Sequence, residues 1–273
     1  MVGCWWLRKY TSAIRLWLGC DLKVRYGLYV LLGVVIIIIV CLVITLYNQK
    51  TEVGVPLNVT MVRACTGNGE CQDQVALLDG EIKANSASVT FDQLLKIAII
   101  HPTVKTACFR SAGGDIKAAV ALAKLIHEGG FSTCIANEYK LQDDSVLKGF
   151  CQSSCVWVLA SGKETILYDG SALLGFHAAR KVNILGFDSG IDCNALVEFE
   201  GIIKLSAGGG ERFRRLSELL RWSFDQGAGK ATVDCSAQQV DQYYPFFTSV
   251  KDSSSSGRPR CVLKSSNEGL SCH

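Results

Sequence analysis

An uncharged run at residues 28–47 divides the chain and constrains what can form on either side of it. The run reads LYVLLGVVIIIIVCLVITLY. About 20 apolar residues in a helix match the roughly 30 Å hydrocarbon core of a bilayer. A cleaved signal peptide is the competing interpretation. However, its apolar region spans only about 7–15 residues, and no small-residue cleavage site follows before Asn48. We therefore expect an uncleaved transmembrane helix at 28–47.

The charges beside this run predict its orientation. Just after it come Lys50 and Glu52, whereas the residues before it carry five basic groups against Asp21, namely Arg8, Lys9, Arg15, Lys23 and Arg25. Because excess Lys and Arg stay on the cytoplasmic side, we expect a cytoplasmic N-terminus and an extracytoplasmic, for example periplasmic, position for residues 48–273. The mixture of Trp, Leu, Arg and Lys at 5–18 suits either a segment in the membrane interface or a disordered basic tail.

The cysteines indicate the compartment of the outer part. Of the 13 cysteines, ten lie after the apolar run, at positions 65, 71, 108, 134, 151, 155, 193, 235, 261 and 272. An even number suits up to five disulfides in an oxidising space. The short Gly-, Asn- and Ser-containing loops favour the local pairs Cys65–Cys71 and Cys261–Cys272. No Cys or His spacing typical of zinc is present, so we expect no metal site.

Helix-like and strand-like patterns alternate after residue 75. The pattern predicts strands at 75–82, 104–109, 131–136, 166–168 and 173–176, and helices at 88–100, 116–128, 155–160, 198–205 and 211–222. Ser88 and Thr90 are expected N-caps of the first helix, and 137–149 is expected to be a polar loop. This succession favours an α/β domain with a mostly parallel core sheet. The net charge of +3 is spread out, which gives no indication of nucleic-acid binding.

The expected organisation therefore has five parts. They are a cytoplasmic or interfacial basic segment (1–27), a transmembrane helix (28–47), a stalk with a cysteine loop (48–74), an α/β domain (75–250), and a Ser-rich connector with a disulfide-linked C-terminal tail (251–273).

Two short motifs in the α/β domain have residues suited to chemistry. Ser111-Ala112-Gly113-Gly114 joins a predicted strand to a helix, and glycines there expose backbone N–H groups that could stabilise an oxyanion or simply form a tight turn. Ser153, between Cys151 and Cys155, precedes a short apolar helix. It has the position of a nucleophile and equally that of an N-cap serine.

The order of these motifs resembles the ClpP/crotonase superfamily, specifically ClpP-like serine peptidases and their membrane-anchored relatives. The resemblance covers about residues 75–180 and rests on Gly80, the Ser-Ala-Gly-Gly turn, Ser153, Gly162 and Gly175-Phe176-His177. Ala112 replaces the proline that is usual in the family's turn. The resemblance implies a ClpP/crotonase-like spiral of ββα units.

The resemblance also implies roles for individual residues. Ser153 would be the nucleophile, His177 the general base, and the N–H groups of Gly114 and Ser154 the oxyanion hole. Asp225 lies at about the expected distance for the third catalytic residue, with Asp234 as a second candidate. A Ser-His dyad without an aspartate, or a Ser-Lys dyad with Lys163 or Lys181, stays open.

These observations lead to one expected function and two alternatives. We expect a membrane-anchored serine-type peptidase that acts on peptides or proteins outside the cytoplasm and needs no cofactor. Its partners would be the bilayer through residues 28–47 and, by analogy with the family, further copies of itself or a membrane complex. The alternatives are an inactive structural or assembly subunit with the same fold, and acyl-CoA chemistry of the crotonase type.

Overall fold

The chain divides into two units, Met1–Glu52 and Val53–His273. A computed structural model describes residues 33–42, 56–182, 188–226 and 232–253, together with Cys261 and Cys272. In the first unit, residues 33–42 form an α-helix with mostly exposed side chains. Among the described residues, no helix combines the length and the apolar character needed to cross a bilayer. The rest of the expected span 28–47, and the whole interfacial segment 5–18, lie outside the described residues.

The second unit is built on an eight-stranded sheet in the order β13-β8-β4-β3-β2-β1-β5-β6. Its strands are β1 (Asn58–Cys65), β2 (Cys71–Asp79), β3 (Thr106–Arg110), β4 (Ser132–Ile135), β5 (Glu138–Lys140), β6 (Val146–Lys148), β8 (Thr165–Leu167) and β13 (Ser249–Val250). The five strands from β13 to β2 are parallel, and β1, β5 and β6 continue the sheet in antiparallel pairings. The α/β class is therefore confirmed, with a sheet that is only partly parallel.

Helices connect the strands and contribute residues to the larger hydrophobic core on one face of this sheet. They are α2 (Ala87–Ile100), α3 (Ile116–Glu128), α4 (Ser154–Leu159), α5 (Cys193–Ala207), α6 (Gly210–Asp225) and α7 (Ala237–Tyr243). Helix α3 has the predicted bounds and is capped by Asp115, whose carboxylate accepts a hydrogen bond from Ala118 N at 2.8 Å. The caps expected for α2 were wrong. The N-cap is Ser86, and Thr90 lies inside the helix, where its hydroxyl accepts a hydrogen bond from Leu57 N–H.

Alternating side chains of the strands give the sheet two buried faces. Leu78 and Phe109 point into the larger core, which includes residues of α2, α3, α4 and α5. Their neighbours Leu77 and Cys108 point to the opposite face, where a smaller cluster forms around the fully buried Tyr139. Because successive side chains of a strand alternate between faces, near-continuous apolar runs are expected in strands covered on both sides.

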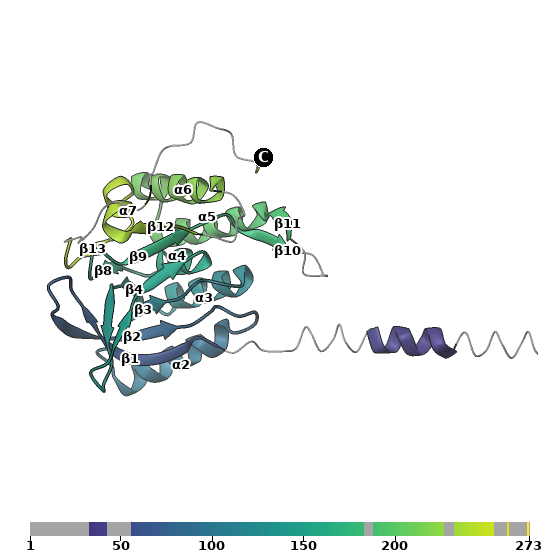
Figure 1. The fold of residues 1–273 in the computed structure, drawn as a ribbon, viewed down its shortest axis with the longest axis horizontal. Helices are drawn as coiled ribbons and strands as arrows, with labels where there is room; N and C mark the ends of the chain where they lie inside the picture. Colours follow the sequence, from purple (N-terminus) through teal and green to yellow (C-terminus); the bar gives the residue numbers. More distant parts are fainter. Residues whose placement is uncertain are drawn as a thin grey trace, which may run out of the picture. The chain divides into compact units, whose positions relative to one another are not determined.

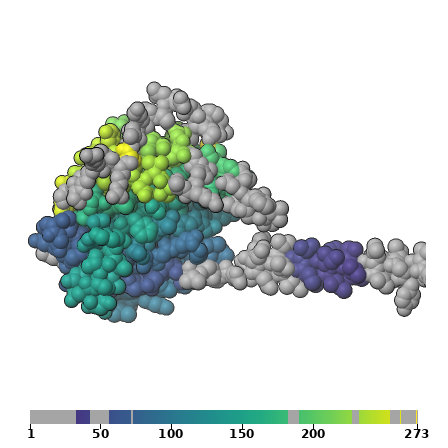
Figure 2. Space-filling model, viewed as in Figure 1, coloured from purple at the N-terminus to yellow at the C-terminus, as the bar shows by residue number. Residues whose placement is uncertain are grey.

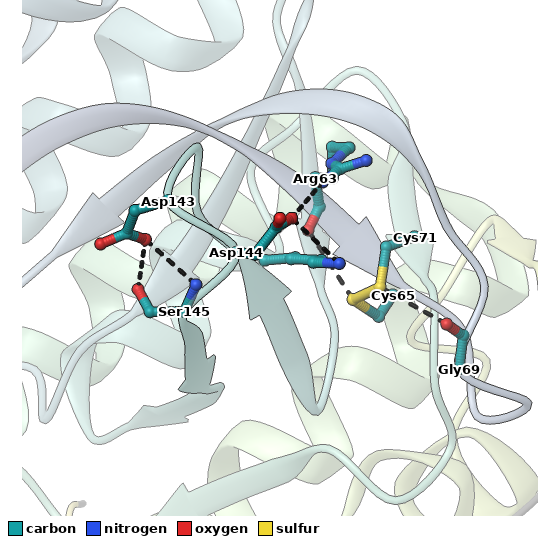
Figure 3. Close-up of polar contacts among 8 residues, drawn as sticks. Arg63, Cys65, Gly69, Cys71, Asp143, Asp144 and Ser145 are labelled. Carbon is teal, nitrogen blue, oxygen red and sulfur yellow. Dashed lines mark hydrogen bonds and ion pairs between the residues drawn. A yellow bond between two sulfur atoms is a disulfide. The ribbon is translucent and has the colours of Figure 1, made fainter.

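The polar loop expected at 137–149 was wrong, because this stretch contains the hairpin of β5 and β6. The hairpin pairs with the edge of β1 and covers the smaller core with Tyr139. Figure 3 shows Asp144, in the hairpin turn, reaching back to Arg63 of β1 at 3.1 Å. The same view shows the neighbouring Cys65–Cys71 disulfide. Strand β1 itself lies in the stretch assigned from sequence to the stalk.

Five disulfides join the ten cysteines that follow the apolar run, namely Cys65–Cys71, Cys108–Cys134, Cys151–Cys155, Cys193–Cys272 and Cys235–Cys261. The predicted number and the Cys65–Cys71 pair are confirmed. The predicted Cys261–Cys272 pair was wrong, since Cys261 bonds to β12 and Cys272 to the start of α5. Within the described ranges, no group of Cys, His, Asp and Glu side chains could hold a metal ion.

A second, three-stranded sheet positions the candidate site. It has the order β12-β9-β7, with β7 (Phe150–Gln152) parallel and β12 (Val233–Ser236) antiparallel to the central β9 (Leu173–Phe176). Figure 1 shows β9 and β12 beside α4, and Figure 2 shows the green and yellow C-terminal segments packed against the teal middle of the chain. Strands β10 (Arg180–Val182) and β11 (Asp188–Ile191) form a separate antiparallel pair that follows β9.

Candidate active site

Ser153 lies between β7 and α4 in an unusual backbone conformation. Its φ of 56° and ψ of −131° place a non-glycine residue in a region that L-residues rarely adopt. An N-cap serine normally has an extended backbone and accepts a hydrogen bond from the first turn of the helix. Ser153 has neither feature, because its φ is positive and its side chain makes no capping hydrogen bond. Ser153 therefore occupies the N-cap position of α4, as one interpretation expected, but its side chain does not cap the helix.

Three neighbouring contacts hold this conformation. The Ser153 N–H donates to Gly175 O of β9 at 2.8 Å. The Cys151–Cys155 disulfide closes the chain around residues 152–154. Gly113 packs so closely that a Cβ there would lie 2.6 Å from Gln152 O and 2.8 Å from Ser153 Cβ. Strained backbone of this kind, costing on the order of 1–3 kcal/mol, persists only where the surroundings fix it, and it concentrates at functional sites.

The Ser-Ala-Gly-Gly turn brings backbone N–H groups beside Ser153. Ser111 forms a parallel bridge to Cys151 of β7, which aligns the turn with the start of α4. Gly114 has a φ of 141° and pairs with Ile82, and a Cβ there would lie 2.1 Å from Ile82 O. The pairing uses Gly113 O and Asp115 N, so the polar groups of Gly114 face the other way. Gly114 O accepts a hydrogen bond from Ser154 Oγ at 3.3 Å.

The N–H groups of Gly114 and Ser154 are available in this arrangement. No residue in the described part of the chain accepts a hydrogen bond from either of them. Two such donors, aimed at the point where negative charge develops on a substrate oxygen, are what an oxyanion hole requires. Both residues line the same cavity as Ser153.

His177 follows β9 and lines this cavity too. Its Nδ1 lies 2.7 Å from Ala178 O. Because a carbonyl oxygen only accepts, Nδ1 must have the proton, which leaves Nε2 of the neutral ring as the acceptor. Burial lowers the pKa of His177 below its ordinary value of 6.5, and the charge of Arg180 lowers it further, while the Ala178 carbonyl acts in the opposite direction. His177 is therefore neutral at pH 7 and able to accept a proton.

The described hydrogen bonds include none between Ser153 Oγ and His177. Both residues nevertheless line one cavity of about 760 Å³, as do Gly114 and Ser154. Hydrogen bonds between reacting groups are often long in a site without substrate and shorten when it binds. The buried rings of Trp157, Phe199 and Phe224 form the apolar part of the cavity wall.

The remaining sequence candidates lie in different places. Asp225 is the last residue of α6 and does not line the cavity. Asp234 lines the cavity, but its carboxylate accepts from Gln152 Nε2 and Thr232 Oγ1, whereas Nδ1 of His177 bonds to its neighbour's carbonyl. Lys163 and Lys181 are exposed and lie outside the cavity lining. Gln152 and Thr232 were not predicted from the sequence. No strand pattern marks β12, whose Asp234 accepts hydrogen bonds from both of them.

Comparison with known proteins gives matches to solved structures. No family model and no curated protein sequence matches the chain. A serine-to-alanine mutant of 1510-N, a membrane-bound stomatin-specific protease, is similar with a TM-score of 0.44 and 12% identity, over 64% of this chain and 77% of that one. The ClpP protease catalytic domain from Plasmodium falciparum gives a TM-score of 0.42 and 15% identity, over 64% and 83% of the two chains.

Proposed function

We propose that the chain is a membrane-anchored serine-type peptidase that acts outside the cytoplasm. The observation behind the proposal is that Ser153, strained and without a capping role, shares one cavity with a neutral histidine and two uncommitted N–H groups. A nucleophile, a base and an oxyanion hole are the groups that acyl transfer requires.

Each of these groups has a defined role in the proposed reaction. His177 Nε2 takes the proton of Ser153 Oγ as that oxygen attacks the substrate carbonyl carbon. The Gly114 and Ser154 N–H groups stabilise the resulting oxyanion. The protonated His177 gives its proton to the leaving amine, which departs as the acyl-enzyme forms. His177 then takes a proton from a water molecule as the water oxygen attacks the acyl carbonyl carbon, and it gives that proton to Ser153 Oγ as the acyl group leaves as a carboxylic acid. In this scheme the Ala178 carbonyl orients the ring, so the proposal is a Ser-His dyad.

A fluorophosphonate probe tests the nucleophile, because it forms a covalent adduct with activated serines. The wild-type protein is expected to be labelled at Ser153. Ser153→Ala is expected to abolish labelling and His177→Ala to slow it by at least a hundredfold. Ser154→Ala is the matched variant, since it removes the neighbouring hydroxyl and keeps the backbone N–H. Labelling that survives Ser153→Ala but not Ser154→Ala would assign the nucleophile to Ser154, and a wild-type protein that is not labelled contradicts the proposal.

A structural or assembly subunit is the second candidate. It is favoured by the orientation of His177 through a backbone carbonyl in place of a carboxylate. On this alternative, Ser153→Ala and His177→Ala leave assembly of the complex and the phenotype intact. The crotonase-type alternative is less well supported, because an extracytoplasmic site lacks a supply of acyl-CoA.

We also propose that residues 28–47 anchor the protein and that residues 48–273 lie in an oxidising compartment. Support for the compartment comes from the five disulfides that follow the apolar run. Membrane fractionation of the full chain, beside a variant lacking residues 1–47, tests the anchor. Protease protection in sealed vesicles tests the orientation, and light scattering of detergent-solubilised protein tests the proposed self-association.

A further inference from the structure

A polar row crosses the three-stranded sheet directly beside Ser153. Gln152, Gly175 and Asp234 occupy matching positions on β7, β9 and β12. The side chains of the two outer residues meet over the glycine, with Gln152 Nε2 donating to Asp234 Oδ1 at 3.0 Å. A Cβ on Gly175 would lie 2.5 Å from Gln152 Cγ and 2.8 Å from Asp234 Oδ1, so the contact requires glycine at this position.

This row offers acceptors to the cavity. The carboxylate of Asp234 only accepts, so the amide nitrogen of Gln152 must face it, which leaves Gln152 Oε1 available as an acceptor. Thr232 Oγ1 donates to the same Oδ1 atom at 2.8 Å. In the part of the chain that the structure describes, no hydrogen bond involves Asp234 Oδ2. Both donors thus bond to Oδ1 of Asp234, and Oδ2 is left to accept a hydrogen bond from a ligand.

Three other titratable residues line the cavity with Asp234, namely Glu81, His177 and Arg180. Glu81 forms an ion pair with Lys83, outside the row. Arg180, the first residue of β10, lines the same cavity and is positively charged. Burial keeps His177 itself neutral at pH 7. A negatively charged acceptor beside a second acceptor, next to the nucleophile, is suited to a cationic donor such as an ammonium or guanidinium group.

From this arrangement we infer that Asp234 and Gln152 form a subsite that selects a lysine or arginine side chain of the peptide substrate near the cleaved bond. The inference rests on the proposed peptidase function and names its substrate class. The aromatic wall of Trp157, Phe199 and Phe224 would take a neighbouring apolar residue. The subsite therefore predicts a preference for peptides that combine a basic and an apolar side chain.

A binding experiment tests the subsite without requiring turnover. Fluorescent alanine–leucine hexapeptides with one lysine, moved through every position, are titrated by anisotropy against full-length Ser153→Ala protein in detergent. A matched series replaces lysine by norleucine, which keeps the aliphatic chain and removes the ammonium group. We expect at least one lysine peptide to bind about tenfold more tightly than its norleucine partner, since a charge-assisted hydrogen bond is gained. Arginine peptides are expected to follow lysine.

Adding either of two further substitutions to the Ser153→Ala protein identifies the carboxylate that causes the lysine preference. Asp234→Asn keeps the size and the acceptor for Gln152 and Thr232, and it is expected to reduce the lysine preference to less than twofold. Glu81→Gln removes a charge from the same cavity and is expected to preserve the preference. The inference is overturned if no peptide binds, if lysine and norleucine peptides bind equally, or if Glu81→Gln removes the preference while Asp234→Asn keeps it.

Failure of the subsite and failure of the peptidase function give different results. Fluorophosphonate labelling of the protein with Ser153 present reports on the nucleophile and does not require a peptide side chain. Labelling without lysine preference contradicts the subsite alone. Lysine-selective binding without labelling supports the subsite and contradicts the peptidase.

Discussion

Gly113→Ala is the substitution for which the structure gives the clearest expected effect on Ser153. Gly113 has a φ of 86°, so alanine would adopt a left-handed backbone at a cost of about 1–2 kcal/mol. Its methyl group would also lie 2.8 Å from Ser153 Cβ and 3.0 Å from Ser154 N. Ordinary contacts begin near 3.4 Å, so Ser153 would have to move by about 0.6 Å. A displacement approaching 1 Å in a site can reduce rates by about a hundredfold.

Gly130→Ala is the control that separates the effect of displacing Ser153 from the effect of backbone strain. Gly130 also has a positive φ, 70°, but a Cβ there would meet no atom within 4 Å. Gly130→Ala is expected to lose about 1–2 kcal/mol of unfolding free energy, and Gly113→Ala more than this because of its added clashes; each kcal/mol lowers the melting temperature by about 2–4 °C. Fluorophosphonate labelling of folded protein is expected to fall by 30-fold to 100-fold in Gly113→Ala only, on the order given for a displaced site.

Two results would refute the reasoning about Gly113. One is a labelling rate for Gly113→Ala equal to that of Gly130→Ala at matched folded fractions, which would mean that the turn does not control the position of Ser153. The other is an equally large loss of labelling in Gly130→Ala, which would mean that global destabilisation explains both. Circular dichroism during thermal unfolding supplies the folded fractions.

The remaining predictions concern pH and the disulfides. Only neutral His177 accepts a proton, and burial lowers its pKa, so the labelling rate is expected to be constant above pH 7 and to fall at lower pH with a midpoint below 6.5; a midpoint above 6.5 would contradict the burial of the base. Replacing Cys151 and Cys155 by alanine, across a separation of 4 residues, is expected to cost about 2 kcal/mol of unfolding free energy yet remove most labelling. Replacing Cys108 and Cys134, across a separation of 26 residues on the far face of the sheet, is expected to cost about 3.5 kcal/mol and to leave the labelling rate of the folded fraction unchanged. Chemical denaturation should show the larger loss of stability without Cys108–Cys134, and labelling should show the larger loss of rate without Cys151–Cys155.

Local patterns predicted the elements that depend on local sequence. Helix α3 was predicted with its observed bounds because 13 mostly apolar and helix-forming residues closely follow the Ser-Ala-Gly-Gly turn. The β5–β6 hairpin was missed because each strand has three residues, and β6 exposes most of its side chains. Its pairing with β1 depends on the buried Tyr139, whose hydroxyl donates to Phe109 O. That contact is set by the tertiary fold, which a short window does not contain.

For the disulfides and the site too, local features could be predicted from the sequence, whereas features set by the tertiary fold could not. Cys261–Cys272 was favoured because the intervening loop is short, but Cys261 lies at the core beside β12 and pairs with Cys235. Ser153, Gly114 and His177 were predicted as a group, and they line one cavity. Asp234 could not be placed against Gln152 from sequence, since 82 residues separate them and β12 is a strand of four residues.

The backbone conformation of Ser153 separates it from a helix-capping serine more clearly than any motif does. A capping serine lowers the energy of its helix, and therefore adopts the extended backbone that directs its hydroxyl to the first turn. Ser153 instead has a strained backbone and contributes no cap to α4. Gly113, Gly175 and the Cys151–Cys155 disulfide come from separate parts of the fold, and each restricts this residue. Such convergence is needed to maintain strain against relaxation, and here it holds Ser153 in the lining of the cavity that His177 also lines.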